Sequence, residues 1–256
     1  MRSPIAEPRT LEDARHEIDR VDSGILELIA KRLALVDRVR ALKSDTGTSS
    51  PLRPAREAIV IRRIMEEAGT EVPQDLCLRI WRSLISAATQ RQAAVHVHAP
   101  GSLIASAGHK LLVCEYFASA ELVAHPDEYA ALSAVKEKAG DIAAVALESH
   151  WVSPFLHGAA GSALVIGSLP FLSRGRPPRV LIWSQAPAEP SGDDETLIVA
   201  QSPPSAWSHL RAKWQLDAGE KTLLCLAGFL PDAELGRSGI AHTVVGRYPS
   251  PIVVRS

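Results

Sequence analysis

The sequence predicts a multidomain α and α+β chain in which a helical module is followed by an α/β module. Its 256 residues correspond to one or two domains, at roughly 150 residues per domain. The first third is rich in Arg, Leu, Ile and Ala and poor in Gly and aromatic residues. The rest is rich in Gly, Pro and Ser and contains short runs of Val, Leu and Ile. We therefore expect a helical domain over residues 1–94 and an α/β domain over residues 95–256.

Composition and charge exclude several classes of protein. The hydrophobic fraction of 46% and charged fraction of 22% are those of a folded domain, and a net charge of −1 does not suggest a nucleic-acid partner. The chain starts without an apolar signal segment, and no apolar stretch approaches the roughly 20 residues of a membrane span. The three cysteines are far apart and show no zinc spacing, which suits a reducing compartment. We expect a soluble cytoplasmic protein.

The first helix is expected to be long. Thr10 is a suitable N-cap with Asp13 three residues later, a variant of the capping box. At about 1.5 Å per residue the helix extends for roughly 48 Å, too long to bury its apolar stripe unless other helices or another chain cover it. The stripe is a heptad made of Leu11, Ile18, Ile25, position 32 and Val39, with Ala14, Val21, Leu28, Leu35 and Leu42.

Two shorter helices are predicted after the first. One covers about residues 55–68, behind a segment rich in Ser, Thr, Gly and Pro, and the other covers about residues 74–94. The second of them has an apolar face formed by Leu76, Ile80, Trp81, Leu84, Ile85 and Ala88.

Position 32 of the heptad is arginine, and it is the most informative residue of the first helix. A guanidinium in an apolar stripe is costly unless it extends to solvent, pairs with a carboxylate or binds an anion. Lys43 lies eleven residues on, which returns it to the same helix face three turns away. Arg15 is about 25 Å from Arg32 along the helix, so one small ligand reaches both only if an antiparallel partner chain supplies one of them.

Glu57 and Gln92 are further polar groups on the two shorter helices, although a glutamine at a helix end is often only solvated. Several cations, one carboxylate and one amide in a helical cavity suit a small dianion that carries a hydroxyl group.

With these spacings, residues 11–92 resemble the all-helical (type II) chorismate mutases. The resemblance is carried by Arg15, Ile18, Val21, Asp22, Ile25, Leu28, Ile29, Ala30, Arg32, Lys43, Arg53, Arg56, Glu57, Ile80, Trp81, Leu84, Ile85 and Gln92. It implies a three-helix domain that forms an intertwined homodimer, needs no cofactor or metal, and converts chorismate to prephenate in aromatic amino acid biosynthesis. No nucleic acid or membrane is implied as a partner.

The resemblance also implies a role for each site residue. Arg32 and the partner chain's Arg15 hold the two substrate carboxylates, Lys43 and Gln92 donate to the ether oxygen, Glu57 binds the ring hydroxyl, and Arg56 lines the site. Two positions depart from the family pattern. No Asp follows Arg53, where the segment is one residue shorter, and Ala88 stands where the family often has Ser.

The second part resembles, more faintly, the prephenate dehydratase and ACT regions of bifunctional phenylalanine-pathway enzymes. Residues 100–102, Glu148-Ser149 and residues 244–249 carry the resemblance. It implies a smaller, degenerate α/β domain, because the middle part has about half the expected length and no Thr-Arg-Phe motif occurs. We therefore expect no dehydratase activity.

Other motifs are weaker. His96 and His98 share one strand face, as a metal pair would, but no Cys or carboxylate cluster lies near them in the sequence. Residues 158–162 are expected to be a plain loop rather than a phosphate-binding turn, residues 187–194 a loop or linker, and Trp207 and Trp214 core residues.

Two alternative functions remain. One is an isochorismate-pyruvate lyase on the same helical scaffold, which differs in substrate and product. The other is a non-catalytic sensor of an aromatic amino acid, dimerised by its helical part. The set of Arg15, Arg32, Lys43, Glu57 and Gln92 argues against the sensor, because a simple dimer seam does not need a cation among aliphatic residues.

Overall fold

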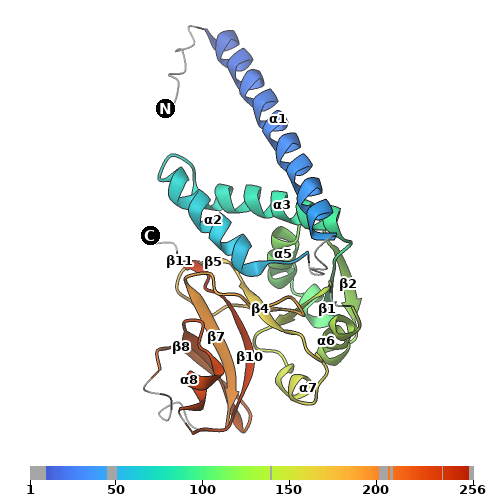
Figure 1. The fold of residues 1–256 in the computed structure, drawn as a ribbon, viewed down its shortest axis with the longest axis vertical. Helices are drawn as coiled ribbons and strands as arrows, with labels where there is room; N and C mark the ends of the chain where they lie inside the picture. The colour runs from blue at the N-terminus through green and yellow to red at the C-terminus, as the bar shows by residue number, and fades with distance from the viewer. Residues whose placement is uncertain are drawn as a thin grey trace. The chain divides into compact units, whose positions relative to one another are not determined.

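A computed structural model describes residues 10–44, 51–138, 140–201, 207, 210–237 and 239–253. These residues belong to two compact units, one within residues 1–48 and the other within residues 49–256. Among the described residues, helix α1 lies in the first unit, and the other helices and strands lie in the second (Figure 1).

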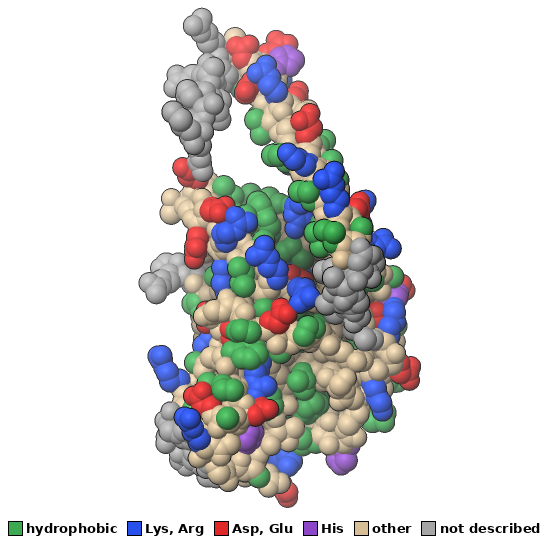
Figure 2. Space-filling model, in the orientation of Figure 1, with side chains coloured by type: hydrophobic (Ala, Val, Ile, Leu, Met, Phe, Trp, Pro, Cys, Tyr) green, Lys and Arg blue, Asp and Glu red, His purple; other side chains and the backbone are tan. Residues whose placement is uncertain are grey.

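Helix α1 covers Leu11–Ser44 and begins as predicted. The Asp13 N–H donates to Thr10 Oγ1 and the Thr10 N–H donates to Asp13 Oδ2, both at 3.0 Å, which forms a reciprocal cap. The heptad side chains other than Ala14 and Arg32 are exposed: Leu28 is 68% exposed and Leu42 is 69% exposed. Figure 2 shows green apolar side chains between charged ones along this helix. The α1 unit therefore does not bury its own apolar stripe.

The helices and strands of the second unit follow one another along the chain. The helical segments are α2 (Pro54–Ala68), α3 (Gln74–Gln92), α4 (Gly101–Ala105), α5 (Ala107–Tyr116), α6 (Glu128–Glu137), α7 (Val152–Leu156) and α8 (Asp232–Gly236). The strands are β1 (His96–Pro100), β2 (Glu121–His125), β3 (Ile142–Ala146), β4 (Leu164–Leu169), β5 (Leu172–Ser173), β6 (Val180–Ser184), β7 (Asp194–Ala200), β8 (Ala212–Ala218), β9 (Lys221–Ala227), β10 (His242–Pro249) and β11 (Ile252–Val253).

The predicted bounds of α2 and α3 agree with the structure within two residues. Helix α2 starts at Pro54, whose missing N–H costs nothing in the first helical turn. Helix α3 stops at Gln92, because Ala93 takes an extended conformation that leads into β1.

One large mixed sheet organises the second unit. Its strand order is β2-β1-β3-β6-β4-β10-β7-β9-β8, and β5 pairs with β11 in a separate two-stranded sheet. Strand β1 is parallel to both β2 and β3, and β4 is parallel to β10, whereas the other pairs in the large sheet are antiparallel. The multidomain α and α+β class is confirmed.

The sheet separates two hydrophobic cores, because neighbouring residues of a strand face opposite sides. In β3, Ile142 and Ala144 belong to one core, while Ala143 and Val145 belong to the other. The first core includes α3 and α5 residues, and the second contains Leu132 and Val135 of α6. A third, smaller core lies between β7, β9 and α8.

Helices α2 and α3 share the first core with the sheet. Ile61 and Met65 of α2 and Ile85 of α3 are buried in the same cluster as strand residues such as Val97 and Ile182. Figure 1 shows both helices beside the α/β region. These two helices therefore obtain part of their hydrophobic packing from residues beyond position 94, and the boundary at 94/95 stays a prediction.

Several local predictions are confirmed. Residues 157–162 form turns, with Gly158 and Gly161 in the left-handed region at φ 81° and 58°. Trp207 is buried, and Trp214 packs against the second core. None of the helices in the described parts of the chain has the length and apolar character that a membrane crossing requires.

Candidate active site

Three of the six predicted site residues lie on α1. Arg15 is exposed and Arg32 is half-buried, while the side chain of Lys43 lies outside the described residues. Burial lowers the pKa of Arg32 from its usual value, because desolvation disfavours the charged guanidinium. Helix geometry separates Arg15 and Arg32 by about 25 Å, so this helix alone does not bring the two cations to one small ligand.

The other three predicted residues lie on α2 and α3. Arg56 is exposed, and the amide of Gln92 donates to the backbone carbonyl of Ala88 at 3.3 Å. The carboxylate of Glu57 accepts a hydrogen bond at 2.6 Å from Arg82 of α3. Thus, within the second unit, no hydrogen bond between described residues links Glu57 to Arg56 or Gln92.

The sequence analysis missed Arg82, a buried cation of α3 that makes several contacts. Its side chain is only 4% exposed. Its Nε and Nη2 both donate at 3.3 Å to the backbone carbonyl of Tyr116, and the guanidinium lies 3.6 Å from the centre of the Tyr116 ring. Burial alone would lower the pKa of Arg82, but Tyr116 and Glu57 raise it above its usual value.

The sequence contains a signal that identifies Arg82. Residues 78, 82, 85 and 89 follow helical spacing on α3, and this row is otherwise apolar or small. An arginine in such a row needs a partner, by the same argument that distinguishes Arg32 on α1.

The two departures from the family pattern have structural counterparts. Arg53 Nη1 donates to Glu189 at 2.7 Å, so this arginine binds the loop before β7. Ala88, which stands where the family often has Ser, is buried.

A further arginine of α2 also binds that loop. Arg62 donates to the carbonyls of Ser191, Asp193 and Ser250, at 3.2, 2.7 and 2.9 Å. Helix α2 is therefore tied by hydrogen bonds to the C-terminal half of the sheet.

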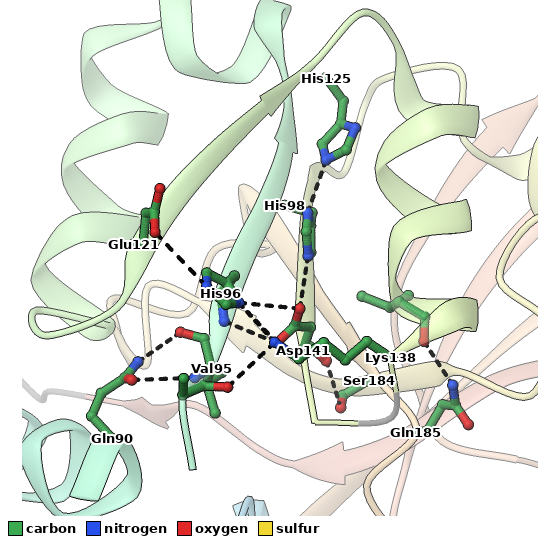
Figure 3. Close-up of polar contacts among 12 residues, drawn as sticks. Gln90, Val95, His96, His98, Glu121, His125, Lys138, Asp141, Ser184 and Gln185 are labelled. Carbon is green, nitrogen blue, oxygen red and sulfur yellow. Dashed lines mark hydrogen bonds and ion pairs between the residues drawn. The ribbon is translucent and has the colours of Figure 1, made fainter.

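A second polar cluster lies on β1 and its neighbours (Figure 3). His98 Nε2 lies 3.1 Å from Asp141 Oδ2, and His98 Nδ1 lies 2.8 Å from His125 Nε2. Lys138 Nζ lies 3.0 Å from the other oxygen of Asp141 and 2.9 Å from His96 Nδ1. The histidine pair noted in the sequence is thus part of a charged network built around one buried aspartate.

The contacts in this cluster account for the direction of two pKa shifts. Burial alone would raise the pKa of Asp141, but hydrogen bonds from the His96 N–H, His98 and Lys138 lower it. Burial and the neighbouring His98 lower the pKa of His125, although Asp127 acts in the opposite direction. No group of three ligands suitable for a metal ion occurs among the described residues.

Another cavity lies elsewhere in the second unit. It has a volume of about 470 Å³ and lies between the β3–α7 loop and the β8–β9 hairpin. Glu148 and Ser149 line it on one side, and Asp217, Glu220 and Lys221 line it on the other.

One family model, described as chorismate mutase type II, matches part of this chain. Residues 14–93 match the family model of that description, and this range includes all six predicted site residues. The resemblance predicted for α1–α3 is confirmed at the level of the family.

One curated relative combines both families named in the sequence analysis. It is the bifunctional chorismate mutase/prephenate dehydratase of Aquifex aeolicus strain VF5, which is 32% identical over 91 residues. The match covers 34% of this chain and 25% of the relative, so it spans a quarter of the relative's length.

Two solved structures are similar to part of this chain at low sequence identity. A prephenate dehydratase from Streptococcus mutans matches with a TM-score of 0.42 and 12% identity, over 62% of this chain and 100% of that one. GqqA, described as a novel type of quorum quenching acylase, matches with a TM-score of 0.42 and 14% identity, over 61% of this chain and 95% of that one. At these scores neither structure assigns a function to the α/β region.

Proposed function

We propose that this protein is a chorismate mutase, which rearranges chorismate to prephenate in aromatic amino acid biosynthesis. The match of residues 14–93 to the type II family carries the proposal. The residues that the family uses in its site occur on three helices whose bounds agree with the predicted ones.

The proposed roles follow the chemistry of the substrate. Arg32 and the partner chain's Arg15 bind the two carboxylates, which holds the reactive diaxial conformer of chorismate. Lys43 and Gln92 donate to the ether oxygen. Glu57 accepts from the ring hydroxyl, and Arg56 lines the same site.

The reaction is an intramolecular Claisen rearrangement and needs no nucleophile or base. The C–O bond breaks ahead of C–C bond formation, so negative charge grows on the ether oxygen. Fixed donors aimed at that oxygen therefore stabilise the transition state more than the ground state. This requirement accounts for a site built from cations and an amide.

A homodimer is part of the proposal. The 25 Å or so between Arg15 and Arg32 along one helix excludes a shared small ligand within one copy of α1. The exposed apolar stripe of α1 supports coverage by a second chain, because a stripe of this length is rarely left in water.

The test is an absorbance assay of chorismate loss with the purified full chain, followed by identification of the product. Prephenate is the expected product. Isochorismate in parallel, with pyruvate as readout, detects the lyase alternative. A chain that consumes neither substrate contradicts both enzyme assignments and favours the sensor.

A further inference from the structure

Arg82 is held rigidly from the side of α5. The last carbonyls of a helix lack partners within the helix, and that of Tyr116, the last residue of α5, accepts two hydrogen bonds from the Arg82 guanidinium. The same guanidinium stacks on the Tyr116 ring at 3.6 Å. These contacts fix both the place and the plane of the guanidinium.

The remaining Arg82 donor fixes one oxygen of Glu57. Arg82 Nη1 donates to Glu57 Oε2 at 2.6 Å, and the glutamate side chain is 15% exposed. The other oxygen, Oε1, accepts no hydrogen bond from any residue that the structure describes. The carboxylate thus has one oxygen bound to a fixed cation and one that remains able to accept.

We propose that Arg82 is a positioning residue of the mutase site, which holds Glu57 so that its second oxygen accepts a hydrogen bond from the ring hydroxyl of chorismate. This inference rests on the proposed function and on the role of Glu57 in it. It adds a residue that none of the family motifs in the sequence includes.

The electrostatics favour a hydroxyl at that oxygen. When one oxygen of a carboxylate binds an arginine, the second oxygen can accept an O–H donor and repels a substrate carboxylate. The pair therefore distinguishes the hydroxyl end of chorismate from its two carboxylates and sets the orientation of the ring.

A double-mutant cycle on the full chain tests this role. The variants are Glu57→Gln, Arg82→Met and both together, with kcat and KM for chorismate and the thermal midpoint measured for each. Arg82→Lys is the conservative variant, because it keeps the positive charge but replaces the planar guanidinium with an ammonium group. Arg79→Met is the matched control, because Arg79 lies on the same helix with a 65% exposed side chain.

We expect Arg82→Met to raise KM about tenfold with kcat changed less than about twofold, since the hydroxyl contact exists in both ground and transition states. In the Glu57→Gln background, the same substitution should change KM less than about twofold, because Arg82 acts through Glu57. Arg82→Lys should recover part of the loss, and Arg79→Met should leave both constants unchanged.

Equal losses from Arg82→Met in both backgrounds would overturn the positioning role and leave a purely structural one. If Arg82→Met does not fold, the cycle is measured with Arg82→Lys, and the same comparison decides. An inactive wild-type chain overturns the proposed function itself, so the two failures are distinguishable.

Discussion

Helices α1 and α3 each carry an arginine in a row of otherwise apolar or small residues, and the surroundings of the two arginines differ. Arg82 of α3 is buried against Glu57 and Tyr116, which raise its pKa. Arg32 of α1 is half-buried, and desolvation lowers its pKa. One sequence signature therefore leads to two electrostatic situations.

An arginine in an apolar row of a helix can therefore serve either the fold or the site. At Arg82 a carboxylate on a neighbouring helix compensates the charge, and the pair is part of the fold. The role proposed for Arg32, which the family resemblance implies, is to bind a substrate carboxylate. The first arginine should then affect both stability and orientation of substrate, and the second mainly catalysis.

The strongest test of this contrast is the loss of the α1 cations. Arg32→Ala and Lys43→Ala should each lower kcat/KM by about two orders of magnitude or more, because one lost donor in a dry site costs about 3 kcal/mol. Circular dichroism and thermal unfolding should show that the fold survives. Near-normal turnover in both variants would contradict the site assignment.

The second test concerns the source of Arg15. Arg15→Ala and Arg32→Ala chains should each be inactive alone. After mixing and subunit exchange, hybrid dimers have one site with both arginines intact, so about a quarter of wild-type activity should return in a symmetric two-fold dimer. A fully active monomer in sedimentation would refute the shared site.

The third test compares the same residue type in the two units. Ile61 is 1% exposed and Ile25 is 49% exposed. Ile61→Ala should lower the free energy of unfolding by about 2–5 kcal/mol at every protein concentration, since it leaves a cavity in the core. Ile25→Ala should act mainly on dimer dissociation, so its effect should grow on dilution. Denaturant unfolding at two protein concentrations separates these outcomes, and a concentration-independent loss for Ile25→Ala would be the contrary result.

The helices could be predicted from the sequence because the residues that define a helix and its ends are close together in the chain. The Thr10 and Asp13 cap, the heptad and Pro54 define helix ends from neighbouring residues alone. The resemblance to the type II chorismate mutases also depends on the spacing of residues along helices. It could therefore be predicted from the sequence as well.

What the sequence did not predict depends on contacts between distant residues. Arg82 meets Glu57 across 25 positions and Tyr116 across 34, and His98 meets Asp141 across 43. The order of the nine-stranded sheet, where β4 lies beside β10, is set by packing on two faces and has no local signal. The sharing of a core between α2, α3 and the sheet is a consequence of the same long-range packing.

The fourth test concerns the polar cluster around Asp141, which lies on the sheet of the second unit. The pKa of His125 is lowered in the folded state, so the unfolded chain binds more protons. The stabilisation is present above the ordinary histidine pKa of about 6.5 and is lost as pH falls through the lowered folded value.

We therefore expect the denaturation midpoint to fall between pH 7.5 and pH 5, and to fall less in His125→Ala. His150→Ala removes an exposed histidine of the same unit and should keep the full decrease. The same decrease in His125→Ala as in the wild type would assign the acid sensitivity to other groups.

The smallest expected effect belongs to the α/β region, where we predict no prephenate dehydratase activity. Dehydration needs an acid that protonates the leaving hydroxyl while carbon dioxide is lost. In the dehydratases that this region resembles, a threonine in a Thr-Arg-Phe motif is central, and no such motif occurs here. Glu148 is exposed after β3, on the open cavity. Desolvation and Arg179 lower the pKa of nearby His109, which makes its imidazole a poor acid at neutral pH.

Incubation of the protein with prephenate at neutral pH should therefore yield phenylpyruvate no faster than the spontaneous reaction, and Glu148→Ala should not change that rate. The mutase activity of the same preparation shows that the chain is folded. Phenylpyruvate formation well above the spontaneous rate, abolished by Glu148→Ala, would show that the α/β region keeps a working acid.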